Sequence, residues 1–142
     1  DFVEHGMEIE EAFHPLIAEP VANSFTLERG MLLTGSNASG KSTFLKTVEI
    51  CALLAQTIQT VPAKKYSAER YRIYSSMSLR DDLENGESYY MVEIRSIKRI
   101  LEAAKELGTK VLCLVDEVLR GTNTVERIAA ASEIMRSPVA SP

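Results

Sequence analysis

Apolar residues recur along this chain in short blocks, some with the spacing of strands and one with that of a long helix. The continuous apolar runs at 31–33 and 111–115 predict buried strands, the second of them a central parallel strand. A broad apolar stripe from Ser42 to about Thr60 predicts a helix packed against a sheet. Its members are Phe44, Leu45, Val48, Cys51, Ala52, Leu54 and Ala55. This succession of strand, helix and strand predicts an α/β fold.

A second amphipathic helix of about five turns is predicted between Ser88 and Gly108. Ser88 is well placed as its N-cap, and Gly108 is a natural stop. The expected apolar face consists of Met91, Ile94, Ile97, Leu101, Ala104 and Leu107. The charged residues that lie between them are Glu93, Arg95, Lys98, Arg99, Glu102 and Lys105.

Weaker patterns complete the prediction. Short strands are expected at 7–12, 24–27, 71–74 and 77–79. A helix is expected from Val125 to about Met135, with Thr124 as its cap, and the tail 138–142 is expected to be disordered.

Between the first apolar run and the first helix, residues 35–42 read G-x-x-x-x-G-K-[ST], with Gly35, Gly40, Lys41 and Ser42 in the fixed places. A loop that wraps a phosphate aims backbone N–H groups inward, and it needs glycine where φ is positive or a Cβ would clash. The following helix points its positive end at the same anion. Lys41 can then reach the β- and γ-phosphates, and the Ser42 hydroxyl can ligate Mg²⁺.

Two carboxylates, Asp116 and Glu117, follow the apolar run at 111–115 directly. The carboxyl ends of strands are where α/β sheets place their chemistry. After a phosphate loop, this pair is the expected second half of an ATP site. Asp116 is predicted to hold Mg²⁺, and Glu117 to orient the attacking water or accept its proton. We expect the pair to face the loop 35–42 across one cleft.

Composition excludes several classes. The chain of 142 residues is 45% apolar, which suits one globular domain, and its formal net charge of −4 argues against a large nucleic-acid surface. The acidic start is not that of a signal peptide, and the apolar run 50–58 is too short to span a bilayer. Cys51 and Cys113 are interpreted as buried free thiols of a reduced compartment. The chain is therefore expected to be soluble and cytoplasmic.

Taken together, these segments resemble the ATPase domain of the MutS family, a branch of the ABC-class P-loop ATPases. The resemblance covers nearly the whole chain. In the residues of these motifs, the chain most resembles the short MutS-like proteins of bacteria. The segments that carry it are TGSNASGKSTFLK at 34–46, VPA at 61–63, DDLENGESYYMVE at 81–93 and LVDEVLRGTNT at 114–124, with His14-Pro15 and EPVAN at 19–23 near the start.

The resemblance implies roles by position. The triphosphate of ATP or ADP would be wrapped by Gly35, Ser36, Asn37, Ala38, Ser39, Gly40, Lys41, Ser42 and Thr43. Asp116 and Glu117 would be the Walker B pair, with Ser42 and Asp116 on Mg²⁺ and with Lys41 and Glu117 as the catalytic residues. Ser88, which the local pattern explains as a helix cap, would instead reach the γ-phosphate bound by a partner subunit.

The resemblance also implies an architecture. The expected fold is an incomplete three-layer α/β/α sandwich of the P-loop NTPase type, in one partial domain over 1–142. Lead-in strands at 1–30 precede a core at 31–137 and the tail at 138–142. The family's switch histidine follows the Walker B region, whereas the histidines here are His5 and His14. The parent protein would be a homodimer that acts on DNA through other domains, in the manner of DNA mismatch repair proteins.

Two other functions would use some of the same residues. A P-loop kinase for a small molecule would also use Lys41 and Asp116, but it calls for an arginine-bearing lid that no segment of the sequence suggests. A nucleotide-gated scaffold would bind ATP without consuming it, and the presence of Glu117 argues mildly against that function.

Overall fold

A computed structural model describes residues 1–28, 30–77, 89–106, 108–117 and 132. These residues form a mixed α/β structure with two sheets, which confirms the predicted α/β class. The chain divides into unit 1, Asp1–Ile73, and unit 2, Tyr74–Pro142. The three-layer sandwich stays a prediction.

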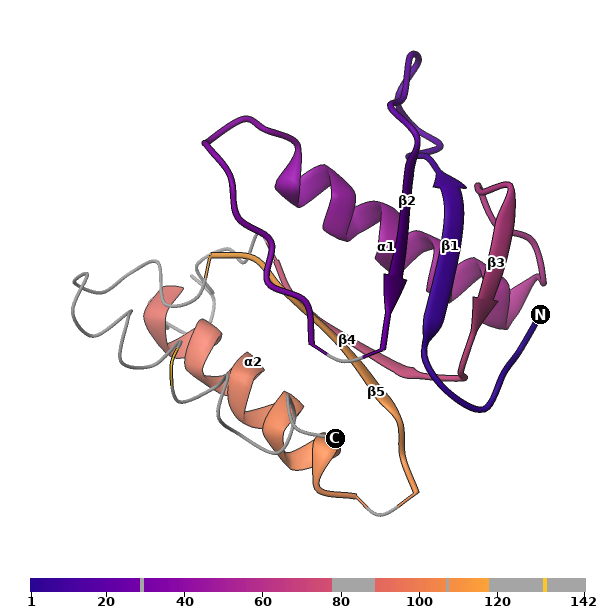
Figure 1. Cartoon of the computed structure of the whole chain (residues 1–142). Helices are drawn as coiled ribbons and strands as arrows, with labels where there is room; N and C mark the ends of the chain where they lie inside the picture. The colour runs from indigo at the N-terminus through magenta and orange to yellow at the C-terminus, as the bar shows by residue number, and fades with distance from the viewer. Residues whose placement is uncertain (29, 78–88, 107, 118–131, 133–142) are drawn as a thin grey trace. The chain divides into compact units, whose positions relative to one another are not determined.

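Unit 1 is built on a three-stranded sheet in the order β2-β1-β3 (Figure 1). Strand β1 is Met7–Ala12, as predicted, and β2 is Asn23–Leu27, one residue longer than predicted. Strand β3, Lys65–Ala68, was not predicted. Both neighbours run antiparallel to β1, so that Ile9 lies opposite Phe25 on one side and Tyr66 on the other.

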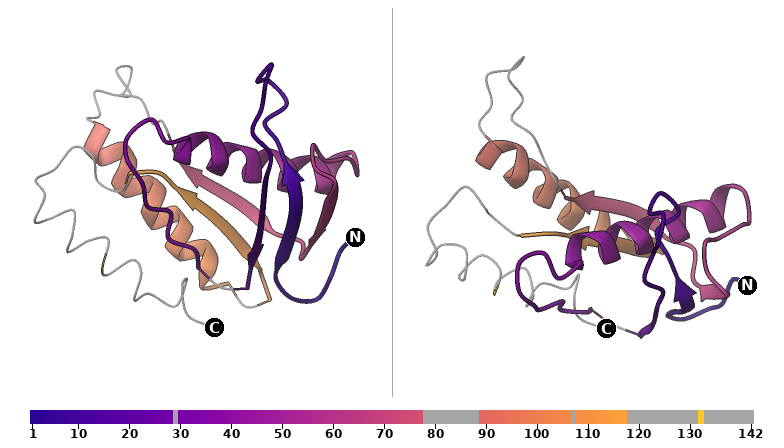
Figure 2. Two further views of the ribbon diagram at one scale, coloured as in Figure 1. Left: turned by 45° about the horizontal axis from the view of Figure 1, so that its top comes forward. Right: turned by 90° about the horizontal axis from the view of Figure 1, so that it is seen from above.

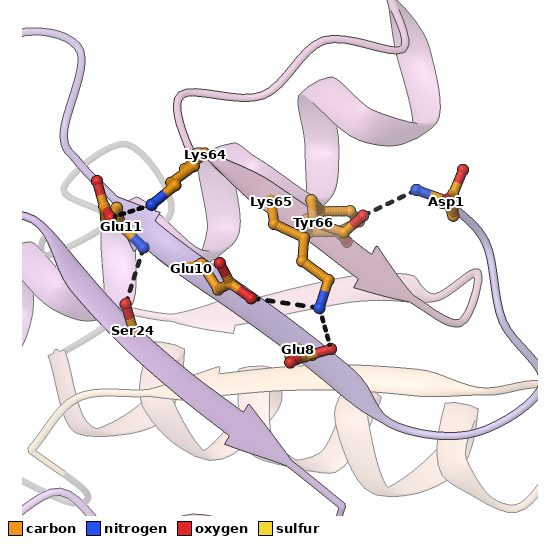
Figure 3. A network of polar contacts seen from close by, with 8 residues as sticks. All are labelled: Asp1, Glu8, Glu10, Glu11, Ser24, Lys64, Lys65 and Tyr66. Atoms are coloured by element: carbon orange, nitrogen blue, oxygen red, sulfur yellow. Dashed lines mark hydrogen bonds and ion pairs between the residues drawn. The ribbon is translucent and has the colours of Figure 1, made fainter.

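The two faces of this sheet differ because side chains alternate along β1. Met7 and Ile9 are buried, and the alternation then breaks at Glu11, whose positive φ of 51° accompanies a register shift that buries Ala12. Glu8 and Glu10 accept hydrogen bonds from Lys65 Nζ on β3 at 2.9 and 3.2 Å (Figure 3). One face of the sheet is therefore apolar, and the other carries exposed ion pairs.

Helix α1, Lys41–Thr57, packs on the apolar face of the sheet (Figures 1 and 2). The predicted helix is confirmed, although it ends three residues early, where Gln59 takes a left-handed φ of 56°. Most of the predicted stripe is half-buried or buried, and Thr47 joins its buried part. The buried residues of α1 are Thr47, Val48, Cys51, Ala52 and Ala55.

The strand predicted at 31–33 is wrong. Residues 31–34 have no secondary structure, and Leu32 is 71% exposed. A strand requires backbone partners on a neighbouring chain. Within the part of the chain that the structure describes, no strand pairs with this run.

Unit 2 contains helix α2, Tyr89–Ala104, and strand β5, Val111–Val115, which contact each other. Both were predicted. Strand β4, Arg72–Ser76, starts in unit 1, extends the strand predicted at 71–74 and pairs with β5. Along β5, Leu112 and Leu114 are buried while the other three residues are half-buried. The run is thus less evenly buried than expected for a strand covered on both faces.

The buried face of α2 differs from the predicted one. Met91, expected inside, is 44% exposed, whereas Glu93, expected among the charged residues outside, is 2% exposed. The other buried residues are Ser96, Ile100 and Ala103. Successive residues of an α-helix are rotated by about 100° around its axis. The helical spacing of the buried residues was therefore predicted correctly, but the buried face is displaced by about one residue from the predicted one. Packing partners distant in sequence decide between such faces.

Several predictions lie outside the described residues. These are the N-cap at Ser88, the end of the strand predicted at 77–79, the cap at Thr124, almost all of the helix predicted at 125–135, and the tail. Met77, which is described, is not in a strand.

Among the helices that the structure does describe, none is long and apolar enough to cross a membrane. Both cysteines are free thiols, as predicted; Cys51 is buried and Cys113 half-buried.

Replacing a buried residue of β1 should destabilise the protein. Ile9 is 1% exposed, so Ile9→Ala is expected to lower the free energy of unfolding by about 2–5 kcal/mol. Leu53 lies on the exposed side of α1, and Leu53→Ala should change it by no more than about 0.5 kcal/mol. Urea unfolding of both variants tests this, and equal losses would contradict the assigned core.

Stability should fall in alkaline solution. Burial raises the pKa of Cys51 to about 11 and that of Tyr71 to about 12. The unfolded chain releases these protons at the ordinary, lower pKa, so the folded state is favoured fully below about pH 8. That contribution is lost as the pH rises from about 9 through 12. Unfolding measured across this range should show the decline, and Cys51→Ala should make it shallower; an unchanged slope would exclude the Cys51 contribution.

Candidate functional site

The predicted phosphate loop is an exposed turn at the start of α1. Residues 35–40 are exposed, and Ser39 N–H donates to Ser36 O at 3.3 Å across the turn. Three residues have positive φ: Gly35 at 154°, Ala38 at 62° and Gly40, the N-cap of α1, at 87°. When left-handed residues such as Ala38 and Gly40 interrupt a loop, the backbone curves. Successive N–H groups of such a curved loop can point toward one concave side, where they can bind an anion.

Lys41 holds this turn together. Its Nζ donates to the carbonyl oxygens of Gly35 at 2.9 Å and Ser36 at 2.6 Å. An ammonium group has three donors, so these two bonds leave capacity for an anion. The sequence predicted a role for Lys41 on phosphates alone. Its second role, shaping the loop, carries no local sequence signal because it depends on the path of the backbone.

Gly35 is required by close packing as well as by its conformation. A Cβ at this position would lie 3.0 Å from Ser39 Oγ, and the φ of Gly35 is 154°. Any larger residue at 35 would displace Ser39 or the loop itself. Glycine is therefore favoured at position 35 both by the backbone conformation and by the close approach of Ser39.

The first turn of α1 is open to an anion. Its N-cap, Gly40, provides no side-chain hydrogen bond, and the first turn contains no acidic residue. The first N–H groups of a helix have no partner within the helix, and the aligned peptide dipoles place about half a positive charge there. Ser42 and Thr43 are exposed at this end, and Thr43 O accepts a bond from Thr47 Oγ1 at 2.8 Å. Geometry and electrostatics both favour a negatively charged ligand.

The acid pair follows β5, as predicted. Asp116 is half-buried, and its N–H donates to Ser76 O at 3.1 Å, which continues the pairing of β5 with β4. Glu117 is exposed and has a left-handed φ of 52°, which is uncommon for a residue with a Cβ. The backbone therefore turns sharply at the residue for which a catalytic role was predicted.

The loop and the acid pair belong to separate units. Gly35 to Thr43 belong to unit 1, Asp116 and Glu117 to unit 2, and Ser88 lies outside the described residues. A single cleft shared by loop and acid pair stays a prediction. No group of three or more His, Cys, Asp or Glu that could hold a metal ion occurs among the described residues.

Comparison with known proteins identifies the class to which this arrangement belongs. Residues 31–140 match the model of MutS domain V. The chain therefore belongs to the MutS family.

Individual relatives agree with this assignment. Human MutS protein homolog 4 is 38% identical over 130 residues, which cover 84% of this chain and 14% of that protein. The DNA mismatch repair protein MutS of Thermotoga neapolitana is 39% identical over 138 residues, 92% of this chain and 17% of that protein. The MutS protein of Clostridium kluyveri is 35% identical over 138 residues. The chain thus spans only about a sixth of the length of these relatives.

Exchanging glycine and alanine at the two left-handed positions of the loop should have opposite effects. Gly40→Ala is expected to lower the free energy of unfolding by about 1 kcal/mol or more, because alanine is strained at a φ of 87°. Ala38→Gly relieves the same strain and should be neutral or stabilising by up to about 1 kcal/mol. Denaturant unfolding measures both. Losses of equal size would contradict the described loop.

Proposed function

We propose that this chain binds Mg²⁺-ATP and hydrolyses it, as part of the ATPase domain of a MutS-like protein with a three-layer P-loop fold. The observation that carries the proposal is the turn at 35–41, closed by Lys41 and set on the open end of α1. Membership of the MutS family supports it, since proteins of this family are ATPases.

The loop residues would hold the phosphates. Backbone N–H groups between Ser36 and Thr43 would bind phosphate oxygens together with the end of α1, and Asn37 would lie near the γ-phosphate. Lys41 would direct its remaining donor to the β- and γ-phosphates and offset the charge that develops on them. The absence of an acidic residue from the first turn of α1 fits this anionic ligand.

The residues present also fit a magnesium ion. Mg²⁺ takes oxygen ligands and is held in nucleotide sites by one or two side chains plus phosphate oxygens and water. A large cluster of acidic ligands is therefore not required. Ser42, exposed at the start of α1, and Asp116, at the end of β5, supply the two oxygen donors.

Glu117 would act on the attacking water, either by orienting it or by accepting its proton. General-base assistance of this kind contributes about 10²- to 10⁴-fold in rate. Glu117 is exposed, which leaves its carboxylate accessible to water.

The parent protein would work as a homodimer. Ser88 would complete the partner's site by reaching its γ-phosphate, and hydrolysis would reopen the dimer around DNA that other domains hold. Relatives that are named DNA mismatch repair proteins support a role on DNA. The net charge of −4 is consistent with DNA contacts outside this chain.

Replacing Glu117 by glutamine separates hydrolysis from binding. In the full-length protein, Glu117→Gln is expected to lower the steady-state rate of phosphate release by about 10²- to 10⁴-fold while ATP affinity is kept. Lys41→Ala should weaken nucleotide binding itself, since it removes both the loop closure and a phosphate contact. Phosphate release and equilibrium binding of ATP are the measurements.

Three results would overturn the proposal. Unchanged phosphate release in Glu117→Gln would remove Glu117 from its role. A requirement for a small-molecule acceptor would indicate a kinase. Tight ATP binding with no phosphate release in single-turnover assays of the unmodified protein would indicate a non-hydrolysing scaffold.

A further inference from the structure

An aromatic pair joins the first turn of α1 to the sheet of unit 1. Phe44, the fourth residue of α1, meets Phe25 of β2 edge to face, with ring centroids 5.1 Å apart and ring planes at 65°. Both side chains are half-buried. The positive edge of one ring meets the negative face of the other, so the contact has a preferred geometry in addition to its apolar area. We call these two residues the aromatic anchor.

Along the chain, the anchor lies between the loop at 35–40 and the buried part of α1. The buried residues of the helix begin at Thr47, whereas Ser42 and Thr43 are exposed. The N–H of Phe44 donates to Gly40 O at 2.8 Å, and this bond closes the first turn of the helix on the last residue of the loop. A contact at Phe44 therefore acts directly on the turn whose free N–H groups would meet a phosphate.

The other contacts of the loop serve a different purpose. Lys41 donates to Gly35 O and Ser36 O, which closes the loop on itself. Residues 31–34, which lead into the loop, have no secondary structure. The aromatic anchor, in contrast, connects the end of the loop to a strand that is paired with β1.

A helix end without such a connection frays, because its first N–H groups have no partner within the helix. A frayed turn must be ordered when a ligand binds, and the cost of ordering lowers the affinity. A turn that is already ordered binds the same ligand more tightly. The aromatic anchor should therefore affect the affinity for phosphate groups although neither ring has a polar atom.

We propose that Phe25 is a positioning residue for the nucleotide phosphates: through the ring of Phe44, it keeps the first turn of α1 ordered before the nucleotide binds. This inference rests on the proposed function. Phe25 touches no phosphate in this role. Phe25→Leu removes the aromatic contact but keeps an apolar side chain beside Ile9, its partner on β1, so the sheet is retained.

The chain offers a matched control on the other side of β1. Ile9 lies opposite Phe25 of β2 and opposite Tyr66 of β3, and residues directly opposite each other share one face of a sheet. Along α1, β2 lies toward the start of the helix and β3 toward its end (Figures 1 and 2). Tyr66→Leu thus removes an aromatic ring from the same face and leaves the aromatic anchor intact. Since Tyr66 is only 8% exposed, this change should destabilise the fold at least as much as Phe25→Leu.

The test measures the dissociation constant of ADP for the full-length protein, at a temperature where every variant is folded. The preferred geometry of an aromatic pair corresponds to about 2- to 12-fold in an equilibrium constant. We expect Phe25→Leu to raise the ADP dissociation constant about threefold to tenfold, and Tyr66→Leu to keep it within about twofold. In a Phe44→Leu background, Phe25→Leu should add less than about twofold, because the contact is already lost.

Hydrogen exchange provides a second measurement that needs no nucleotide. The Phe44 amide, which is bound to Gly40 O, should exchange faster in Phe25→Leu and at an unchanged rate in Tyr66→Leu. Three results would overturn the inference and leave the proposed function standing: unchanged ADP affinity in Phe25→Leu, equal losses in Phe25→Leu and Tyr66→Leu, or additive losses in the double variant. An unmodified protein that does not bind ADP would overturn both.

Discussion

The structure of unit 1 depends on the burial of one face of α1 against β1. Small residues, Cys51, Ala52 and Ala55, form the middle of that face and allow the helix to lie close to the sheet. Nearer the start of α1, Phe44 meets Phe25 of β2 edge to face with ring centroids 5.1 Å apart. The helix is thus packed against the sheet while Ser42 and Thr43 in its first turn stay exposed, so that the loop at 35–40 adjoins a packed helix and still meets solvent.

Elements with strong local signals could be predicted from the sequence. Strands β1 and β5 have the predicted bounds because apolar residues alternate with polar ones at Met7 and Ile9 of β1 and are contiguous in β5. The turn at 35–40 before α1 could be anticipated because the glycines and the lysine that form it lie close together in the sequence. Its role in binding phosphate stays a prediction. The residues at 31–33 and the buried face of α2 were mispredicted because both depend on partners elsewhere in the chain, which a local pattern does not reveal.

Polar contacts between residues distant in sequence could not be predicted from the local pattern either. Strand β3 has a weak apolar pattern, and it is defined by its register with β1 and by the ion pair of Lys65 with Glu8 and Glu10. Gln56 carries no signal at all, since a glutamine within a helix is ordinarily a solvent-exposed residue. Only the path of the chain at Tyr71, fifteen residues later, gives that glutamine two partners. Local sequence therefore suggests candidate site residues, but it does not reveal the contacts that hold their segments in place.

Backbone strain occurs in both candidate segments, as it also does at Glu11 in β1 and at Gln59 after α1. Ala38 in the phosphate loop and Glu117 after β5 both adopt left-handed φ values although neither is glycine. Such conformations cost about 1–3 kcal/mol each and persist only where surrounding contacts enforce them. At Ala38 the enforcing contacts are the bonds from Lys41 to Gly35 and Ser36. At Glu117 the preceding residue is fixed through its N–H to Ser76. In both segments, then, a hydrogen bond to a backbone carbonyl lies beside the left-handed residue. At Lys41 the donor is the side chain, so this residue has a structural as well as a proposed chemical role, whereas at Asp116 the donor is the backbone N–H, which does not depend on the identity of the side chain.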